Sequence, residues 1–118
     1  PSNNDKIMEV DTKLFSDAVD RVSAISNEKS RAIKLLLSSG NLILSANSAE
    51  NDSALEEIPV EYASDELEIG FNSRYLLDIA QQINGETTKF TFADAAAPTL
   101  VEDSSDESAL YVLMPMRV

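Results

Sequence analysis

The carboxyl-terminal stretch Leu110-Tyr111-Val112-Leu113-Met114-Pro115-Met116-Arg117-Val118 carries the strongest signal for the fold. Residues 110–114 are all apolar, which predicts a strand with both faces covered. Pro115 has no backbone N–H to donate, so strand pairing is expected to stop there. Residues 116–118 then form a short apolar end at or near the surface. Flexible methionines in such a place favour a groove that accepts varied partners, while a last strand with a frayed end explains the same residues more simply.

A helix and two more strands precede this terminus. Asn72 or Ser73 is placed to cap the helix, and Asn84-Gly85 to end it, with Gly85 in a left-handed conformation. A strand around Phe90 and Phe92 and another at 99–102 come next, and the acidic, serine-rich residues 102–108 are expected to form a hairpin loop. The apolar stripe of the predicted helix consists of Leu76, Ile79, Ala80 and Ile83.

The first part of the chain has the same organisation. Residues 7–10 predict a strand, and Asp11 or Thr12 is expected to cap a helix that runs to about Ile25. Two strands at 32–38 and 42–46 follow, and Ser39-Gly40-Asn41 between them has the composition of a tight hairpin. The helix has an apolar stripe of Leu14, Phe15, Ala18, Val19, Val22 and Ile25, opposite a face of Lys13, Asp17, Asp20, Arg21 and Ala24.

Two further strands complete the pattern. Residues 57–62 alternate between acidic and apolar side chains, and Pro59 places that strand on an edge or at a bulge. Residues 67–71 alternate in the same way. The order is therefore strand, helix, four strands, helix, three strands. Short strands with helices on one face predict an α+β sandwich made of two similar halves, although no sequence repeat proves the duplication.

Composition indicates one soluble domain covering residues 1–118, with 43% hydrophobic and 25% charged residues. The chain contains no Cys, so disulfides and thiolate metal sites are excluded. No apolar run is long enough to span a bilayer, and no signal peptide is visible. Pro1 at the position of an initiator Met suggests a fragment or a processed product.

The net charge of −12 is unevenly distributed. Residues 1–34 hold six basic and six acidic side chains, whereas residues 35–118 hold three basic and fifteen acidic ones. An acidic body repels nucleic acid at long range, so a tight, autonomous DNA-binding module is disfavoured. The first third is the only part suited to face phosphate, and a solvated surface of mixed sign is the simpler interpretation.

Several kinds of chemistry are excluded by what the sequence lacks. There is no His, which rules out Ser-His and Cys-His nucleophile pairs, and the three glycines are isolated. Asp103, Asp106 and Glu107 lack the glycine and the spaced glutamate of a calcium loop. Paired carboxylates remain open among 21 acidic residues, but no pair stands out. No metal, cofactor or catalytic residue is therefore predicted.

Three stretches in order resemble one known family. These are Ser26-Asn27-Glu28-Lys29, Glu68-Ile69-Gly70-Phe71-Asn72 and the terminal residues 111–118. Together they resemble the third, carboxyl-terminal domain of the bacterial DNA polymerase III sliding clamp, its beta subunit. The resemblance implies the DNA-clamp fold, with a βαβββ pattern in each half. It also implies a non-catalytic processivity factor of DNA replication, located in the cytoplasm at the nucleoid.

The resemblance further implies a mechanism and partners. Clamps of this family form a homodimer that closes into a ring around double-stranded DNA without reading its sequence. They bind DNA polymerase, the clamp loader and repair proteins through short linear motifs. The matching groove positions here are Asn72, Tyr75, Pro98, Val112, Met114, Pro115, Met116 and Arg117. Pro98 replaces a Ser of some relatives, Val112 equally fits the core, and the groove also needs residues of the neighbouring domain, so only half a pocket is expected.

Two more surfaces follow from the same resemblance. Ala24, Ile25, Glu50, Asp52 and Glu56 match the region that joins the next subunit. Arg21 matches a basic family position facing the hole of the ring, and the helical spacing places Lys13 on the same face. The competing hypotheses are an acidic protein-interaction domain with no role at DNA, and an enzyme that uses carboxylates or a metal.

Overall fold

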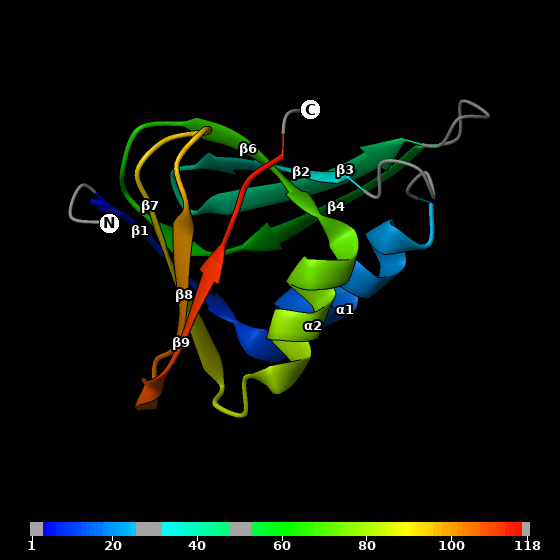
Figure 1. The fold of residues 1–118 in the computed structure, drawn as a ribbon. Helices are drawn as coiled ribbons and strands as arrows, with labels where there is room; N and C mark the ends of the chain where they lie inside the picture. Colours follow the sequence, from blue (N-terminus) through cyan, green and yellow to red (C-terminus); the bar gives the residue numbers. More distant parts are fainter. Residues whose placement is uncertain (1–3, 26–31, 48–52, 117–118) are drawn as a thin grey trace.

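The computed structural model describes residues 4–25, 32–47 and 53–116, and the described chain forms two antiparallel sheets and two helices (Figure 1). Neither helix in this described part of the chain is long and apolar enough to cross a membrane. The elements in chain order are β1 (Lys6–Asp11), α1 (Thr12–Ser23), β2 (Ala32–Ser38), β3 (Asn41–Asn47), β4 (Ser53–Pro59), β5 (Glu61–Tyr62), β6 (Leu67–Asn72), α2 (Ser73–Gln82), β7 (Thr87–Phe92), β8 (Thr99–Asp103) and β9 (Asp106–Leu113).

Two halves of identical order, β1-α1-β2-β3-β4 and β6-α2-β7-β8-β9, are joined by β5. The sheets have the strand orders β5-β1-β7-β8-β9 and β4-β3-β2-β6. The first strand of each half therefore pairs with the other half: β1 with β7, and β6 with β2. Each sheet is thus built from strands of both halves. The predicted α+β architecture of two βαβββ halves is confirmed.

The core lies where the helices meet the inner faces of the sheets. The two helices lie side by side (Figure 1), with α1 in contact with β1, β3 and β4, and α2 in contact with β6 and β9. Phe15 of α1 and Phe90 of β7 have ring centroids 5.0 Å apart, and Phe90 stacks on Phe92 at 5.9 Å. One continuous cluster of buried apolar side chains thus holds both halves together.

Both helices begin where the side-chain chemistry predicts. The Asp11 carboxylate accepts a hydrogen bond from the Leu14 backbone N–H at 2.9 Å. The Asn72 side chain accepts from the N–H groups of Arg74 and Tyr75 at 2.9 and 3.4 Å. Each cap satisfies donors that lack a partner in the first helical turn. Leu14 itself is 46% exposed, so its predicted place in the apolar stripe is wrong.

Gly40 and Gly85 serve different purposes. Gly40 adopts φ +72° in the tight β2–β3 hairpin, as the sequence predicts. Gly85 does not have a positive φ, so the predicted left-handed cap of α2 is wrong. A Cβ at Gly85 would instead collide with the side chain of Asp103. A side chain at this position would force the side chains of Asp103 and Ser105 to move.

Two boundaries differ from the sequence predictions. The strand expected at 57–62 is two strands, because the chain leaves one sheet after Pro59 and enters the other at Glu61. Pro59 does lie at the end of an edge strand, as predicted. The hairpin loop expected at 102–108 is only Ser104 and Ser105, since the carboxylate of Asp103 accepts hydrogen bonds from the N–H and hydroxyl groups of Ser105. Those bonds let the chain reverse tightly despite its acidic composition.

Candidate functional site

The outward face of β9 is apolar and open to solvent. Val112 is 56% exposed and Leu110 52%, whereas Leu113 faces the core. Met114, just beyond the strand, is 62% exposed. The prediction of a strand covered on both faces is therefore wrong, because β9 is the edge of its sheet and only its inner face meets the helices. A pure core role for Val112 is excluded.

Tyr75, 61% exposed on α2, borders the same apolar face. Its side chain projects from the first turn of the helix, where the cap formed by Asn72 fixes the backbone. An open hollow of about 340 Å³ lies between α2 and the end of β9. We call it the Tyr75 hollow, and its lining residues are Tyr75, Asp78, Ile79, Val112, Leu113 and Met114.

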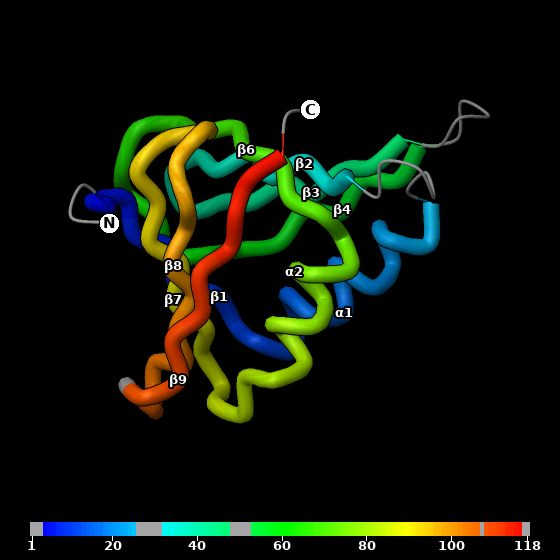
Figure 2. Tube along the Cα trace, in the orientation of Figure 1, coloured from blue at the N-terminus to red at the C-terminus, as the bar shows by residue number. Residues whose placement is uncertain are grey.

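Pro115 and Met116 turn away from this hollow and border another. The Met116 backbone N–H donates to the Gly70 carbonyl at 2.7 Å, so the terminal segment reaches from the sheet of β9 to β6 of the other sheet. Figure 2 shows this end of the chain running beside β6. The second hollow has a volume of about 430 Å³; we call it the Met116 hollow, and it is lined by Glu68, Ile69, Gly70, Ala95, Ala96, Pro115 and Met116.

Two hollows that flank the carboxyl-terminal segment therefore divide five of the predicted groove residues, whereas Asn72 lines neither hollow; the five are Tyr75, Val112, Met114, Pro115 and Met116. Strand pairing stops before Pro115, as predicted, yet Met116 is half-buried and tied to β6, so it is not a loose apolar end. Pro98 lines neither hollow; its carbonyl accepts a hydrogen bond from the Asn4 side chain at 3.1 Å. Arg117 lies outside the described residues.

The predicted DNA-facing side of α1 is exposed, and both of its basic side chains are already paired. Lys13 Nζ lies 3.4 Å from a carboxylate oxygen of Asp17. Arg21 donates to Glu56 of β4 at 2.8 Å. This hydrogen bond raises the pKa of Arg21 and lowers the pKa of Glu56. The face consequently offers little free positive charge to a phosphate.

The predicted subunit-joining residues lie near that ion pair where they are described. Ala24, exposed, follows the last turn of α1, and Ile25 beside it is partly exposed. Glu56 on β4 accepts a hydrogen bond from Arg21 of its own chain, so the predicted DNA-facing and subunit-joining surfaces adjoin at this pair. Glu50, Asp52 and the motif Ser26-Asn27-Glu28-Lys29 lie outside the described residues.

Within the described ranges, no cluster of three or more acidic side chains is arranged to hold a metal ion. Among the described carboxylates, that of Asp103 is buried and has a structural role. Hydrogen bonds from the Ser105 hydroxyl and N–H, and from the backbone of Gly85 and Asn84, lower its pKa. It fastens the β8–β9 turn to the turn after α2, and its chemistry is that of a structural anchor.

Some lining residues were not predicted from the sequence. Asp78 and Ile79 follow Tyr75 at helical spacings of three and four, so the periodicity could have identified them. Ala95 and Ala96 carry no such signal, because only the tertiary fold brings the β7–β8 loop beside Met116.

The fold and its surface define a class: a domain of two interlocked βαβββ halves with an exposed apolar edge at its last strand. The chain belongs to the family of the DNA polymerase III beta subunit, C-terminal domain, whose model matches residues 1–117. The beta sliding clamps of Caulobacter vibrioides and Pseudomonas aeruginosa are 50% and 41% identical to it over all 118 residues. The chain spans 32% of the length of each of these relatives.

Solved structures show the same likeness. The DNA polymerase III subunit beta of Pseudomonas aeruginosa superimposes with a TM-score of 0.97 at 41% identity, covering the whole of this chain and 32% of that one. The sliding clamp of Bartonella birtlesii bound to griselimycin gives a TM-score of 0.95 at 48% identity, with coverage of 100% and 32%. The resemblance noted in the sequence is thereby confirmed.

Proposed function

We propose that this chain is the carboxyl-terminal domain of a ring-shaped processivity factor that encircles duplex DNA and tethers the replicative polymerase. The observation that carries the proposal is the exposed apolar surface of Tyr75, Val112 and Met114 on a domain whose relatives are sliding clamps. We place the full protein in the bacterial cytoplasm, at the nucleoid. The role is non-catalytic: binding and enclosure account for it.

Enclosure explains the weak electrostatics of α1. A ring that surrounds DNA is retained by topology, so it needs no tight grip on phosphate. Lys13 and Arg21 are paired with carboxylates, and Asp20 lies on the same exposed face. Such a face permits sliding, because few counterions are released on contact and few ion pairs with DNA phosphates must be broken as the ring moves.

The surface around the carboxyl terminus suits short linear motifs. Met114 and Met116 provide deformable apolar walls on the two sides of one segment, and Tyr75 adds an aromatic ring with a hydroxyl group. A peptide that lies across this segment would enter both hollows. DNA polymerase, clamp loader and repair proteins are the proposed sources of such motifs, with Asn72, Pro98 and Arg117 supporting the same groove.

Docking is tested with the full-length protein and griselimycin, the compound bound to the Bartonella relative. Replacing both methionines, Met114→Ala with Met116→Ala, should weaken griselimycin binding at least about a hundredfold, because about two buried apolar contacts are lost. Calorimetric titration measures the change. Leu55→Ala, which alters an equally exposed apolar side chain on β4, is the matched control and should bind like the wild type. Unchanged binding by the double variant would refute the docking site.

Ring closure is tested separately. Ile25→Asp places a charge in the proposed subunit contact and should convert the full-length dimer to a monomer without unfolding the domain. Light scattering measures the mass, and circular dichroism confirms the fold. Leu14→Asp, at an exposed position in the first turn of α1, is the control and should remain dimeric. A dimer in both variants would show that the contact lies elsewhere; Ala24, Glu50, Asp52 and Glu56 are the other proposed contributors.

A further inference from the structure

The loop between β7 and β8 forms one wall of the Met116 hollow but has little means of holding its own position. Four of its six residues, 93–98, are Ala, and two of these, Ala95 and Ala96, line the hollow. Methyl groups bury little apolar area, so their packing contributes little to fixing a loop. Within the loop, the described anchor is a hydrogen bond from Ala96 N–H to the Asp94 carboxylate at 2.8 Å. Contacts from outside the loop must therefore fix its place.

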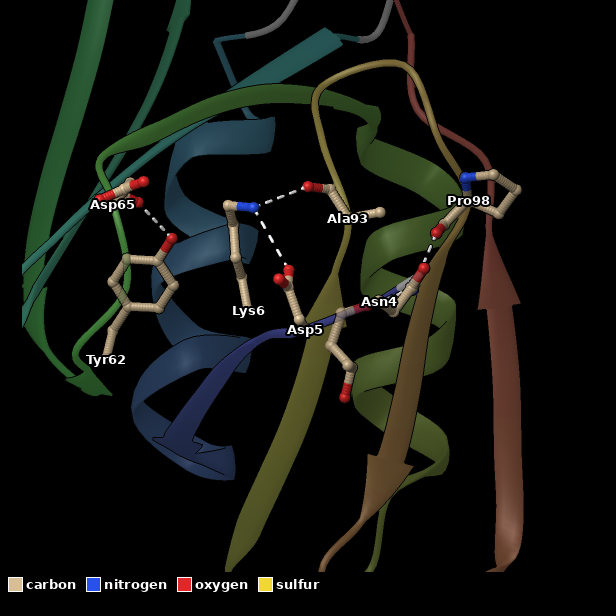
Figure 3. A network of polar contacts seen from close by, with 8 residues as sticks. Asn4, Asp5, Lys6, Tyr62, Asp65, Ala93 and Pro98 are labelled. Carbon is tan, nitrogen blue, oxygen red and sulfur yellow. Dashed lines mark hydrogen bonds and ion pairs between the residues drawn. The ribbon is translucent and has the colours of Figure 1, made fainter. Parts of the chain in front are cut away.

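Asn4 supplies the first of these contacts. Its side-chain amide donates to the Thr91 carbonyl at 2.8 Å and to the Pro98 carbonyl at 3.1 Å. Figure 3 shows the bond to Pro98. One NH₂ group thus joins the chain just before the loop to its last residue. The amide oxygen of Asn4 is buried without a hydrogen-bond partner among the described residues, so the side chain acts here as a donor.

Lys6 holds the other end of the same segment. Its ammonium group donates a hydrogen bond to the carbonyl of Ala93, which is the first residue of the loop, at 3.0 Å (Figure 3). Asp5 assists twice: its carboxylate lies 3.3 Å from Lys6 Nζ, and its backbone N–H donates to Phe92 at 3.1 Å. The residues at the start of β1 therefore bind a loop that lies almost ninety positions further along the chain.

We propose that Asn4 and Lys6 are positioning residues of the docking surface. By fixing both ends of loop 93–98, they hold Ala95 and Ala96 against the Met116 hollow, although neither side chain lines that hollow. The inference rests on the proposed docking function. It extends the functional surface to the start of the domain, a region that neither the apolar edge of β9 nor the terminal methionines would identify as functional.

Asn4→Asp in the full-length protein tests the first anchor. The substitution keeps the shape of the side chain, removes both N–H donors and sets a carboxylate against two carbonyl oxygens. We expect amide hydrogen exchange at Ala95, Ala96 and Ala97 to rise. Griselimycin binding should weaken by about threefold to tenfold, the net contribution of one hydrogen bond, because of the two lost bonds only the one to Pro98 ends within the loop. Exchange within α2 should not change. Asn47→Asp makes the same chemical change at the exposed end of β3 and should alter neither measurement.

Lys6 provides a second test that does not depend on Asn4. Lys6→Met keeps the length of the side chain and removes the donor, whereas Lys6→Arg restores one. The Met variant should show faster exchange at Ala95 and weaker griselimycin binding, and the Arg variant should recover both. A merely stabilising role would instead lower the melting temperature without a change confined to the loop.

The outcomes separate this inference from the function on which it rests. If Met114→Ala with Met116→Ala loses griselimycin binding while Asn4→Asp and Lys6→Met bind like the wild type, the positioning role is overturned and the docking function stands. If the wild type does not bind griselimycin, the docking function is overturned, and the positioning role with it.

Discussion

β4 and β9 occupy equivalent places in the two halves, yet they present different surfaces. Each is the last strand of its half and the edge of its sheet. The exposed residues of β4 are Ser53, Leu55, Glu57 and Pro59, in which polar and apolar side chains alternate. Those at the end of β9 are Leu110, Val112 and Met114, which form a continuous apolar row.

The neighbouring helices increase this difference. Beside β4, Arg21 of α1 reaches across to Glu56 and neutralises it. Beside β9, Tyr75 of α2 leaves the Tyr75 hollow open. The duplicated topology thus determines where the two edges lie, and the outward residues determine what each edge can bind. An edge of mixed polarity that carries charges suits contacts of fixed charge pattern, while an apolar edge with methionine suits partners of varied sequence.

Removing a core side chain that contacts both halves should destabilise β4 and β9 together and so remove the difference between them. Phe90→Ala deletes the ring between Phe15 and Phe92, and we expect it to lower the free energy of unfolding by about 3–5 kcal/mol. Because β7 pairs with β1 of the other half, both edge strands should lose protection together in urea, as followed by amide hydrogen exchange. Loss of protection in β9 alone would show that the halves fold independently.

Inward and outward residues of each edge strand should respond very differently. Leu113→Ala and Ile58→Ala remove buried side chains, and each should cost about 2–5 kcal/mol of unfolding free energy. Leu110→Ala and Leu55→Ala remove exposed side chains and should stay within about 0.5 kcal/mol of the wild type. Chemical denaturation measures all four. A large loss at Leu110 would mean that the outer face of β9 is covered.

The turn that starts β9 can be strained selectively. Gly85→Ala forces a methyl group against the Asp103 side chain, which is already hydrogen-bonded, and should destabilise the domain by about 1–3 kcal/mol. The effect should appear as faster exchange at the start of β9 and not in β4. Gly40→Ala is a useful contrast, since its cost comes from a positive φ in the β2–β3 hairpin and not from a collision.

Asp103 should also make β9 sensitive to acid. Its pKa is lowered in the folded state, so its carboxylate contributes stability above the unfolded pKa of about 3.9, and that contribution is lost as the pH falls through the folded pKa. Asp103→Asn should flatten this part of the curve of melting temperature against pH. If the wild type and the variant show the same acid dependence, the carboxylate does not hold the turn.

The smallest change in stability and in DNA binding is expected from a substitution on β4. Glu56→Gln removes the negative partner of Arg21, an exposed pair whose contribution to stability is small because solvent screens it. The freed guanidinium should raise the salt dependence of duplex DNA binding by the full-length protein by at most about one counterion. Glu57→Gln, which leaves the Arg21 pair intact, is the control. Equal salt slopes for both variants would argue against Arg21 facing DNA.

Local chemistry was predictable wherever neighbouring residues decide the structure. Asp11 and Asn72 cap their helices because a short polar side chain reaches the free N–H groups of the next turn. Tyr75 and Met114, placed in the groove by resemblance, do border one hollow. The extent of β9 was not predictable, because the bonds from Ser105 to Asp103 allow a tighter turn than composition suggests.

By itself, the sequence determined the two similar halves, the helix starts and the absence of histidine and cysteine chemistry, since each depends on residue type and short-range spacing. Only the tertiary structure decided that the halves exchange their first strands, that Arg21 meets Glu56, and that Asn4 holds the loop of Ala95. These contacts join residues far apart in the chain. Their geometry depends on how the sheets pack over the helices, which no local pattern encodes.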